Sequence, residues 1–268
     1  MLPAMTLRGR TAIVTGASSG IGKAAAVELA RRGTRLVLAA RRRTLLEETA
    51  ATCRSLGVEA EVVETDVTRD ADCTQLVETA LRRFGRVDVL VNNAGFAIFD
   101  EIATARIGEL ASMMETNYFG AVRCTQAVLP SMLAQGSGTI VNVASIAGIM
   151  GYARMGGYCA SKFAMIGFSE ALRDEVVPRG IRVAMVCPGT TETEFFTTAE
   201  RGKMPGASRL ILAVTAERIA RAIADAAEDG RYRRIVPAGA ALFMRLKELA
   251  PRLAHLLMRR VSALLERR

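Results

Sequence analysis

The sequence lacks the residues on which several classes of protein depend. Tryptophan is absent, histidine occurs once, and the five cysteines form no CxxC pair. An odd number of dispersed cysteines argues against a disulfide framework, and a single histidine argues against a zinc site and a cysteine–histidine nucleophile. We therefore expect no metal, and we interpret the cysteines as small apolar side chains in a reducing compartment, at Cys53, Cys73, Cys124, Cys159 and Cys187.

Long apolar runs are missing as well. No segment offers about eighteen uncharged apolar residues in a row, and residues 1–10 lack the apolar stretch of a signal peptide. We therefore expect a cytoplasmic protein without a membrane-spanning helix. The net charge of +9 comes without an interleaved basic–aromatic patch. We expect no nucleic-acid partner and attribute the charge to solvated arginines and an anionic cofactor.

What the sequence does contain is a regular alternation of short apolar runs and helix-period runs. Strands are predicted over residues 11–15, 35–40, 59–65, 87–92, 139–143, 181–187 and 233–237. Helices are predicted over residues 20–32, 44–56, 70–84, 107–114, 117–135, 158–178 and 215–229. Apolar strands that alternate with helices are typical of a parallel sheet covered on both faces. The predicted fold class is α/β, a doubly wound Rossmann-like sheet in one domain over residues 1–238.

The C-terminal segment, residues 239–268, differs in character from this domain. Leucines recur at helical spacing with arginines between them, and Pro251 interrupts the pattern. We expect an amphipathic helical extension and a solvated His255. The tail could pack on its own domain or on a partner subunit, cap the substrate cleft, or lie on an anionic membrane surface as a peripheral contact.

A glycine-rich turn follows the first predicted strand. Residues 15–22 are TGASSGIG, and a helix is predicted to begin at Gly20. Glycines let the backbone approach a pyrophosphate closely, and the free N–H groups of a helix N-terminus satisfy phosphate charge. The spacing TGxxxGxG differs from the common GxGxxG and lacks the lysine of a P-loop. The turn predicts a nicotinamide dinucleotide site, and the alternative is an ordinary strand–helix connection.

The end of the second predicted strand bears on which dinucleotide is bound. An NAD-selective site usually places a carboxylate here to hold the ribose hydroxyls, whereas this chain has Ala40 followed by Arg41. A guanidinium can pair with a 2′-phosphate, which a carboxylate would repel. We therefore predict NADP (NADPH) and regard NAD as the less favoured cofactor. The alternative is that residues 41–43 only begin a solvated helix.

A second group of residues has side chains suited to catalysis rather than to cofactor binding. Ser145 follows the fifth predicted strand, and Tyr158 and Lys162 lie four positions apart on one face of the next helix. A lysine cation beside a phenol lowers the tyrosine pKa, and such a tyrosine can exchange a proton with a substrate oxygen. A serine hydroxyl can hydrogen-bond the same oxygen. Hydride transfer from a nicotinamide carbon needs this kind of proton partner.

These motifs together resemble the short-chain dehydrogenase/reductase family, over roughly residues 8–193. Six of them occur in order: TGASSGIG, AAR at 39–41, DV at 66–67, NNAG at 92–95, Ser145 with YCASK at 158–162, and PG at 188–189. The resemblance implies that Tyr158 is the acid/base and that Ser145 positions the substrate oxygen. It also implies that Lys162 lowers the tyrosine pKa and binds the nicotinamide ribose, and that Asn117 holds a water in a proton relay.

The same motifs and resemblance define the expected cofactor contacts. Asn93 is expected near a ribose, although its amide could instead bridge neighbouring strands. The segment 193–208 would be a mobile substrate lid. The expected contacts are Gly16, Ser18, Ser19, Gly20, Ile21, Arg41, Asp66, Val67, Asn93, Ala94, Gly95, Tyr158, Lys162, Pro188, Gly189, Thr191 and Thr193.

We therefore expect an NADP-dependent oxidoreductase that acts on a small carbonyl or secondary alcohol. A ketoacyl, steroid or retinoid reductase is an alternative, and so is a catalytically silent NADP-binding regulator, although the intact set of four catalytic residues argues against the regulator. The resemblance implies a homodimer or homotetramer formed through the helices that carry Asn117 and Tyr158. Among the methionines, Met113, Met114 and Met155 could line the substrate pocket, but core packing is the favoured interpretation.

Overall fold

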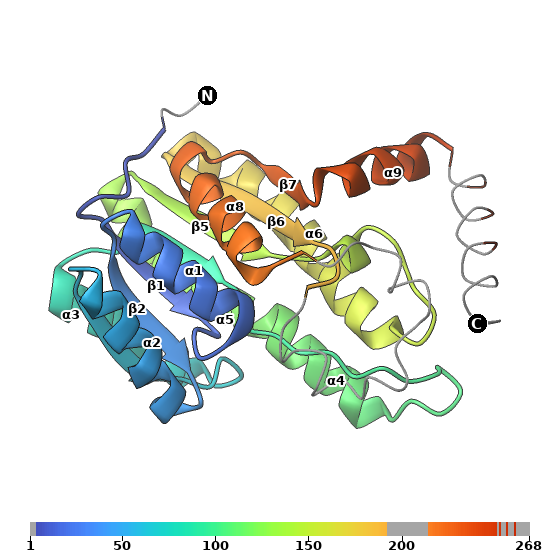
Figure 1. Ribbon diagram of the computed structural model, residues 1–268, viewed down its shortest axis with the longest axis horizontal. Coiled ribbons are helices and arrows are strands. Elements are labelled where there is room, and N and C mark those ends of the chain that lie inside the picture. Colours follow the sequence, from blue (N-terminus) through green and yellow to red (C-terminus); the bar gives the residue numbers. More distant parts are fainter. Residues whose placement is uncertain (1–3, 192–213, 251, 253–255, 257–259, 261–268) are drawn as a thin grey trace.

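The computed structural model describes residues 4–191, 214–250, 252, 256 and 260. Within these residues, seven parallel strands form one sheet in the order β3-β2-β1-β4-β5-β6-β7, with helices on both of its faces (Figure 1). This arrangement confirms the predicted doubly wound Rossmann-like fold. The chain runs outward from β1 to β3 and then returns to place β4 on the other side of β1, which opens a crevice at the carboxyl ends of these two strands.

The element bounds agree with the predictions to within two residues, apart from the start of α5. The strands are β1 Thr11–Thr15, β2 Arg35–Ala40, β3 Ala60–Glu64, β4 Val89–Asn92, β5 Gly138–Val143, β6 Ile181–Pro188 and β7 Arg233–Val236. The helices are α1 Gly20–Arg31, α2 Arg43–Ser55, α3 Asp70–Phe84, α4 Ile107–Met114, α5 Gly120–Gln135, α6 Gly156–Val176, α8 Ala216–Asp229 and α9 Ala238–Leu249. Short 3₁₀ turns cover Ile146–Gly148 and Val177–Arg179.

The core consists of two apolar layers, one on each face of the sheet. Successive strand residues point to opposite faces, so Ile13 belongs to the layer under α3, α5 and α6 whereas Val14 belongs to the layer under α1 and α8. Both side chains are fully buried. Covering both faces explains why the strands are continuous apolar runs without polar alternation.

The helices α4 and α5 are joined without a break. The sequence predicts two separate stretches, but residues Glu115–Phe119 continue the rod as a single π-helical turn. Asn117 lies in this turn and is completely buried. A π turn inside a helix often marks a functional site because it re-aims the side chains around it.

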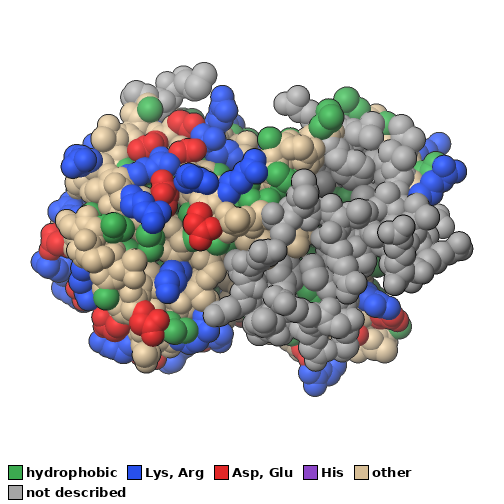
Figure 2. All heavy atoms as spheres, viewed as in Figure 1, with side chains coloured by type: hydrophobic (Ala, Val, Ile, Leu, Met, Phe, Trp, Pro, Cys, Tyr) green, Lys and Arg blue, Asp and Glu red, His purple; other side chains and the backbone are tan. Residues whose placement is uncertain are grey.

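Charged side chains are spread over the surface in mixed pairs. On the face shown in Figure 2, basic and acidic groups alternate rather than gather by sign. Arg32 is an example, since its guanidinium contacts Glu28 at 3.1 Å, Asp225 at 2.7 Å and Glu228 at 2.8 Å and so ties α1 to α8. This arrangement agrees with the interpretation of the arginines as solvated and paired.

The tail begins directly after β7 as α9, which lies beyond the edge of the sheet in Figure 1. Leu242 and Leu249 are 75% and 86% exposed. No helix in the described part of the chain is long and apolar enough to cross a membrane. The expectations for His255 and for a lid over residues 193–208 fall outside the described residues, and the division at residue 238 stays a prediction.

Among the described glycines, the tightest approach to a neighbouring group lies where the glycine-rich turn enters α1. A Cβ atom on Gly22 would stand 2.1 Å from the Gly16 carbonyl oxygen and 2.5 Å from the Asn93 Nδ2 atom. Neither neighbour is the free end of a flexible side chain, so only glycine fits at this position.

We predict that Gly22→Ala lowers the free energy of unfolding by roughly 1–3 kcal/mol, because the new methyl group must push the turn away from β4. Gly167→Ala is the matched control. Gly167 lies on the exposed side of α6, where a Cβ would meet nothing within 4 Å. The control substitution should stabilise by about 0.5–1 kcal/mol. Urea unfolding of both variants checks the pair, and equal stability of the two would contradict the argument.

Candidate active site

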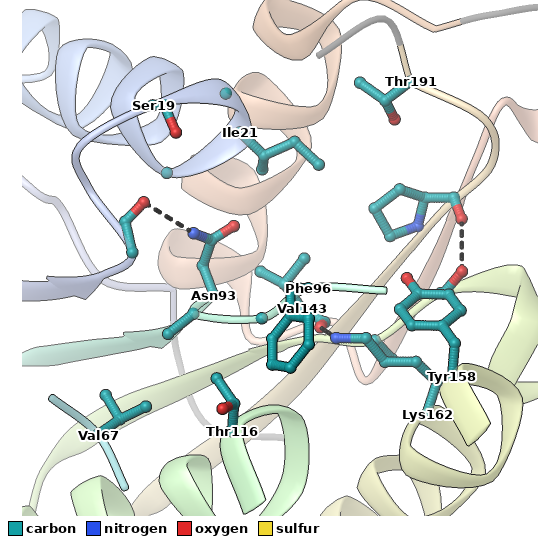
Figure 3. Close-up of a pocket in the computed structure, with 18 of the residues that line it drawn as sticks. Ser19, Ile21, Val67, Asn93, Phe96, Thr116, Val143, Tyr158, Lys162 and Thr191 are labelled. Atoms are coloured by element: carbon teal, nitrogen blue, oxygen red, sulfur yellow. Dashed lines mark hydrogen bonds between the residues drawn. The ribbon is translucent and has the colours of Figure 1, made fainter. Parts of the chain in front are cut away.

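A cavity of about 400 Å³ opens at the carboxyl ends of the strands (Figure 3). Residues that follow β1, β2, β3, β4, β5 and β6 all contribute to its wall. The predicted site residues that line it are Gly16, Ser18, Ser19, Gly20, Ile21, Arg41, Asp66, Val67, Asn93, Ala94, Gly95, Ser145, Tyr158, Lys162, Pro188, Gly189 and Thr191. Thr193 lies outside the described residues. The sheet therefore brings together groups that are spread over residues 16–191.

The glycine-rich turn is attached to β4 through the hydroxyl group of Thr15. This hydroxyl donates to the Val91 carbonyl at 3.2 Å and accepts from the backbone N–H groups of Asn93 at 3.0 Å and Ala94 at 3.1 Å. The Asn93 side-chain amide also donates to the Thr15 carbonyl at 2.9 Å. Of the two roles predicted for Asn93, the structure thus shows the bridge between neighbouring strands. Thr15 itself was not predicted as a site residue.

Two arginines stand at the end of β2, where the sequence singled out only one. Arg41 is exposed at the rim of the cavity, while Arg42 donates to the hydroxyl oxygens of Ser18 at 3.2 Å and Ser19 at 2.6 Å. The guanidinium of Arg42 therefore lies directly on the glycine-rich turn. The pair of adjacent arginines was the available signal, but only the fold shows that the second one reaches back to the turn.

Asp66 follows β3 at the same end of the cavity. Burial raises the pKa of this carboxyl, but the hydrogen bonds from Thr68 and the positive charge of Arg41 outweigh the effect, so the pKa lies below its usual value. Thr68 donates to the carboxylate from both its backbone N–H and its hydroxyl group, at 3.0 and 2.8 Å. Asp66 is therefore an anion that already has hydrogen-bond partners within the chain.

Ser145, Tyr158 and Lys162 line the other end of the cavity, where Figure 3 shows the Tyr158 and Lys162 side chains. The Ser145 hydroxyl interacts with the Tyr158 phenol in the sense that favours the phenolate. The Ser145 oxygen also accepts from the Ala147 N–H at 3.1 Å and donates to the Pro188 carbonyl at 3.4 Å, which fixes its orientation. Lys162 donates to the Val143 carbonyl at 2.9 Å, with its nitrogen 5.8 Å from the centre of the Tyr158 ring.

The pKa of Tyr158 differs from the sequence-based expectation, which was a lowered value. Burial raises it to about 12, and the hydrogen bond with Ser145 offsets only part of this effect. Burial also lowers the pKa of Lys162 to about 8. The physical reason is that both groups are at least nine-tenths shielded from water, which penalises the phenolate as well as the ammonium. In the chain itself, Tyr158 is therefore a protonated acid at neutral pH.

Asn117 lies behind the cavity rather than on its wall. Its side chain clamps residue 96, because Oδ1 accepts from the Phe96 N–H at 2.9 Å and Nδ2 donates to the Phe96 carbonyl at 2.9 Å. Nδ2 also donates to the Ser161 hydroxyl at 3.0 Å, which in turn donates to the Tyr158 carbonyl at 2.8 Å. Ser161 thus links the π turn to the first turn of α6. It was not predicted, although it stands inside the YCASK motif.

The wall around the Tyr158 hydroxyl is mainly apolar in the described part of the chain. Phe96, Ala147, Tyr152 and Met155 form it. Burial raises the pKa of the Tyr152 phenol, which keeps this side chain neutral. Met155 is packed in the same buried cluster as Met113, as expected, and it also lines the cavity.

The fold and this constellation define a nicotinamide-dependent oxidoreductase with a doubly wound sheet. A family model for short chain dehydrogenases matches residues 10–204, and the chain belongs to that family. It is 38% identical to an uncharacterized oxidoreductase of Listeria innocua, over 84% of this chain and 93% of that protein. It is 40% identical to an NADP-dependent 3-hydroxy acid dehydrogenase of Schizosaccharomyces pombe, over 70% and 74%.

A solved structure agrees with this assignment. The short chain dehydrogenase/reductase from Burkholderia phymatum, determined in complex with NAD, superposes with a TM-score of 0.84 at 29% identity. The match covers 93% of this chain and 96% of that chain. The fold that surrounds the cavity is therefore one that holds a nicotinamide dinucleotide.

We predict that Lys162→Met stabilises the protein while it abolishes turnover. Below about pH 8, Lys162 is charged in both the folded and the unfolded chain, so the cost of burying the charge is fully present. A pKa depressed from 10.5 to about 8 corresponds to roughly 3 kcal/mol, of which about 1 kcal/mol is returned by the hydrogen bond to Val143. The variant should gain roughly 2 kcal/mol at pH 7, and this advantage should shrink between pH 8 and 10.5.

Urea unfolding at pH 7 and pH 10 measures this effect. Lys23→Met, at a less buried lysine on α1, is the control for removing a positive charge. A Lys162→Met variant that is less stable than the native protein at pH 7 would show that the ammonium is not a net cost to the fold.

Proposed function

We propose that this protein is an NADP-dependent oxidoreductase that moves a hydride between the nicotinamide ring and a carbonyl or secondary alcohol, with Tyr158 as the acid/base. The observation that carries the proposal is that Ser145, Tyr158 and Lys162 line the same cavity as the glycine-rich turn. A silent binding protein would have no need for a buried lysine beside a buried tyrosine, since each costs stability.

The arrangement supports the following division of work among the residues of this chain. The cofactor, when bound, supplies the hydride. Ser145, held by Ala147 and Pro188, orients the substrate oxygen. Tyr158 is protonated at neutral pH because its pKa is about 12, so it can donate its proton to the oxygen as the carbonyl is reduced. The ammonium of Lys162 then stabilises the phenolate that remains.

The preference for NADP rests on charge at the end of β2. The last two residues of this strand are alanines, and Arg41 and Arg42 follow them at the cavity wall. The Arg42 guanidinium on Ser18 and Ser19, together with Arg41 on the cavity wall, forms a site suited to a 2′-phosphate. NAD remains the less favoured cofactor, although the Burkholderia phymatum relative was crystallised with it.

The substrate proposal rests on the wall around Tyr158. Phe96, Tyr152 and Met155 offer apolar surface and no charge, so the part of the substrate next to its carbonyl is expected to be uncharged. A ketoacyl, steroid or retinoid-type substrate stays an alternative within this description. The related protein of Schizosaccharomyces pombe is named for 3-hydroxy acids, and a test panel should therefore include them.

Oligomerisation is part of the same proposal. Phe119 and Phe163 are 43% and 44% exposed and lie on the helical segments that carry Asn117 and Tyr158. Large exposed aromatic side chains are enriched at subunit contacts, which supports a homodimer or homotetramer formed through these segments. A cytoplasmic location and a peripheral membrane contact of the tail stay predictions.

We predict that Tyr158→Phe reduces kcat/KM for carbonyl reduction by roughly 100- to 10,000-fold, because the variant has no proton to donate. NADPH oxidation is to be followed with a panel of ketones, aldehydes and 3-oxo acids. Tyr232→Phe is the matched control, since burial likewise raises the pKa of this tyrosine to about 12, but it does not line the cavity. Cofactor binding without turnover of any carbonyl, together with no loss in Tyr158→Phe, would favour the silent regulator.

We also predict that Arg41→Ala and Arg42→Ala each raise the KM for NADPH by roughly ten- to a hundredfold and leave the KM for NADH nearly unchanged, because a charge-assisted hydrogen bond to a phosphate is lost. Arg43→Ala is the control. Arg43 is exposed and pairs with Glu47, so its removal should alter neither value. An unchanged NADPH/NADH preference in both test variants would exclude the 2′-phosphate site.

A further inference from the structure

Two cysteines face each other behind the cofactor cavity. The Sγ atoms of Cys73 on α3 and Cys124 on α5 are 3.6 Å apart, which is direct contact between two thiols. Both residues are only 1% exposed. They stand 51 positions apart in the sequence, so the contact is a product of the fold. In the described part of the chain, no other pair of cysteines is in hydrogen-bond contact.

The environment makes the two thiols unequal. The hydrogen bond that Cys124 donates to Cys73 lowers the pKa of the Cys73 thiol below its usual value, with help from the charge of Arg123 and against burial and the carboxylates of Asp70 and Asp72. The same hydrogen bond, together with burial, raises the pKa of Cys124. Cys73 is also the fourth residue of α3, where the helix dipole favours a thiolate. Cys73 is thus the nucleophile of the pair.

We propose that Cys73 and Cys124 are a redox-active dithiol that hydrogen peroxide converts into a reversible disulfide, and that this disulfide weakens dinucleotide binding at the end of the cavity where Val67 lies. The Cys73 thiolate attacks one peroxide oxygen, the O–O bond breaks, and hydroxide leaves and takes up a proton to become water. The Cys124 sulfur then attacks the resulting sulfenic acid, the S–O bond breaks, and a second water leaves. Two thiols and one hydrogen peroxide thus give one disulfide and two waters.

Access to the pair is through the first turn of α3. The side chain of Asp70, which begins this helix, is 88% exposed. Helix ends open locally at a small fraction of the cost of global unfolding. Hydrogen peroxide is a small neutral molecule and can therefore reach a thiol one turn inside the helix, whereas a bulky alkylating reagent is excluded.

The link to the cofactor site is Val67, which lies on the cavity wall (Figure 3). The Cys73 thiol donates to the Val67 carbonyl at 3.6 Å. From the other side, Gly120 packs so closely that a Cβ there would stand 2.6 Å from Val67 Cγ2. Val67 is therefore held between the first turns of α3 and α5, the two helices that carry the dithiol.

Disulfide formation changes both contacts of Val67 at once. The sulfur atoms must approach from 3.6 Å to about 2.05 Å, which draws the first turns of α3 and α5 together. The Val67 carbonyl also loses its thiol donor. This second part of the inference rests on the proposed function, because it assumes that Val67 contacts the cofactor.

The first test detects the bond itself. The full-length native protein is treated with hydrogen peroxide, unreacted thiols are alkylated under denaturing conditions, and the peptides are mapped by mass spectrometry. We expect one cross-linked pair that joins residues 73 and 124, with the loss of two hydrogen atoms and full recovery in dithiothreitol. The cross-link should be absent from Cys73→Ser and Cys124→Ser and present in Cys53→Ser.

Cys53 is the matched control because it is fully buried, without a thiol partner, and burial raises its pKa to about 11. Free thiols at both positions 73 and 124 after peroxide treatment would overturn the proposal. Oxidation of Cys53 at the same rate would overturn it as well, because reactivity would then not depend on the pairing.

The second test measures the coupling by calorimetric titration of NADP into the reduced and the cross-linked protein. We expect the cross-linked form to bind roughly three- to tenfold more weakly, as for the loss of one supporting hydrogen bond. The Cys73→Ser/Cys124→Ser double variant should bind equally before and after peroxide. Equal affinity of the reduced and cross-linked forms overturns the coupling. No binding of any nicotinamide dinucleotide to the reduced protein overturns the proposed function instead, and the peptide map then decides on the disulfide alone.

Discussion

The structure depends on the junction between β1 and β4. The strands β2 and β3 are added on one side of β1, and the strands from β4 onward are added on its other side. One hydroxyl group, that of Thr15, holds this junction by donating to Val91 and accepting from the backbone of residues 93 and 94. The crevice above the junction exists because the chain departs to opposite sides of the sheet at this point. The turn that follows β1 can close over the crevice only while Gly22 lies against the Gly16 carbonyl. The Thr15 hydroxyl, the glycine-rich turn and the crevice therefore depend on one another. Residues that follow the other strands complete the wall of the cavity.

A second constraint is that the Tyr158 and Lys162 end of the cavity is shielded from water. Lys162 is an amine held in a region that disfavours its charge, and buried hydrogen bonds surround it. Ser161 and Asn117 connect the π turn to α6, and about two helical turns further along α6, Asn142 on β5 donates to Ser169 at 2.8 Å. These buried bonds fix the rotation of α6 about its axis, and that rotation decides where the phenol of Tyr158 points. The buried ammonium of Lys162 thus occurs beside a network of buried hydrogen bonds that holds α6 in place.

Much of this arrangement could be predicted from the sequence, and the parts that could not share a physical reason. The strand at residues 11–15 and the helix at residues 70–84 match their predictions because local signals bound them: a continuous apolar run in the first case, and Gly85 in a left-handed conformation in the second. Ser145, Tyr158 and Lys162 could be selected together with the glycine-rich turn because their motifs are local, and the fold places them on one cavity wall. Four features could not be predicted because they arise from contacts between segments far apart in the sequence. They are the hydrogen bonds of Arg42 to the glycine-rich turn, the hydrogen bonds of the Asn93 amide within the chain, the raised pKa of Tyr158, and the contact between Cys73 and Cys124. Periodicity carries no information about such contacts.

The π turn at residues 115–119 has a consequence for what determines the position of Asn117. A π turn spans its rise with one residue more than an α-helix would use, so the number of residues in this stretch, and not only their types, sets where its side chains point. The position of Asn117 is set by that extra residue as much as by its identity. Removing one residue would return the rod to regular α-helical winding, and every position after it would rotate by about 100°. Part of this active site is therefore encoded in the length of a helix, and a comparison of residue types alone would not detect its loss.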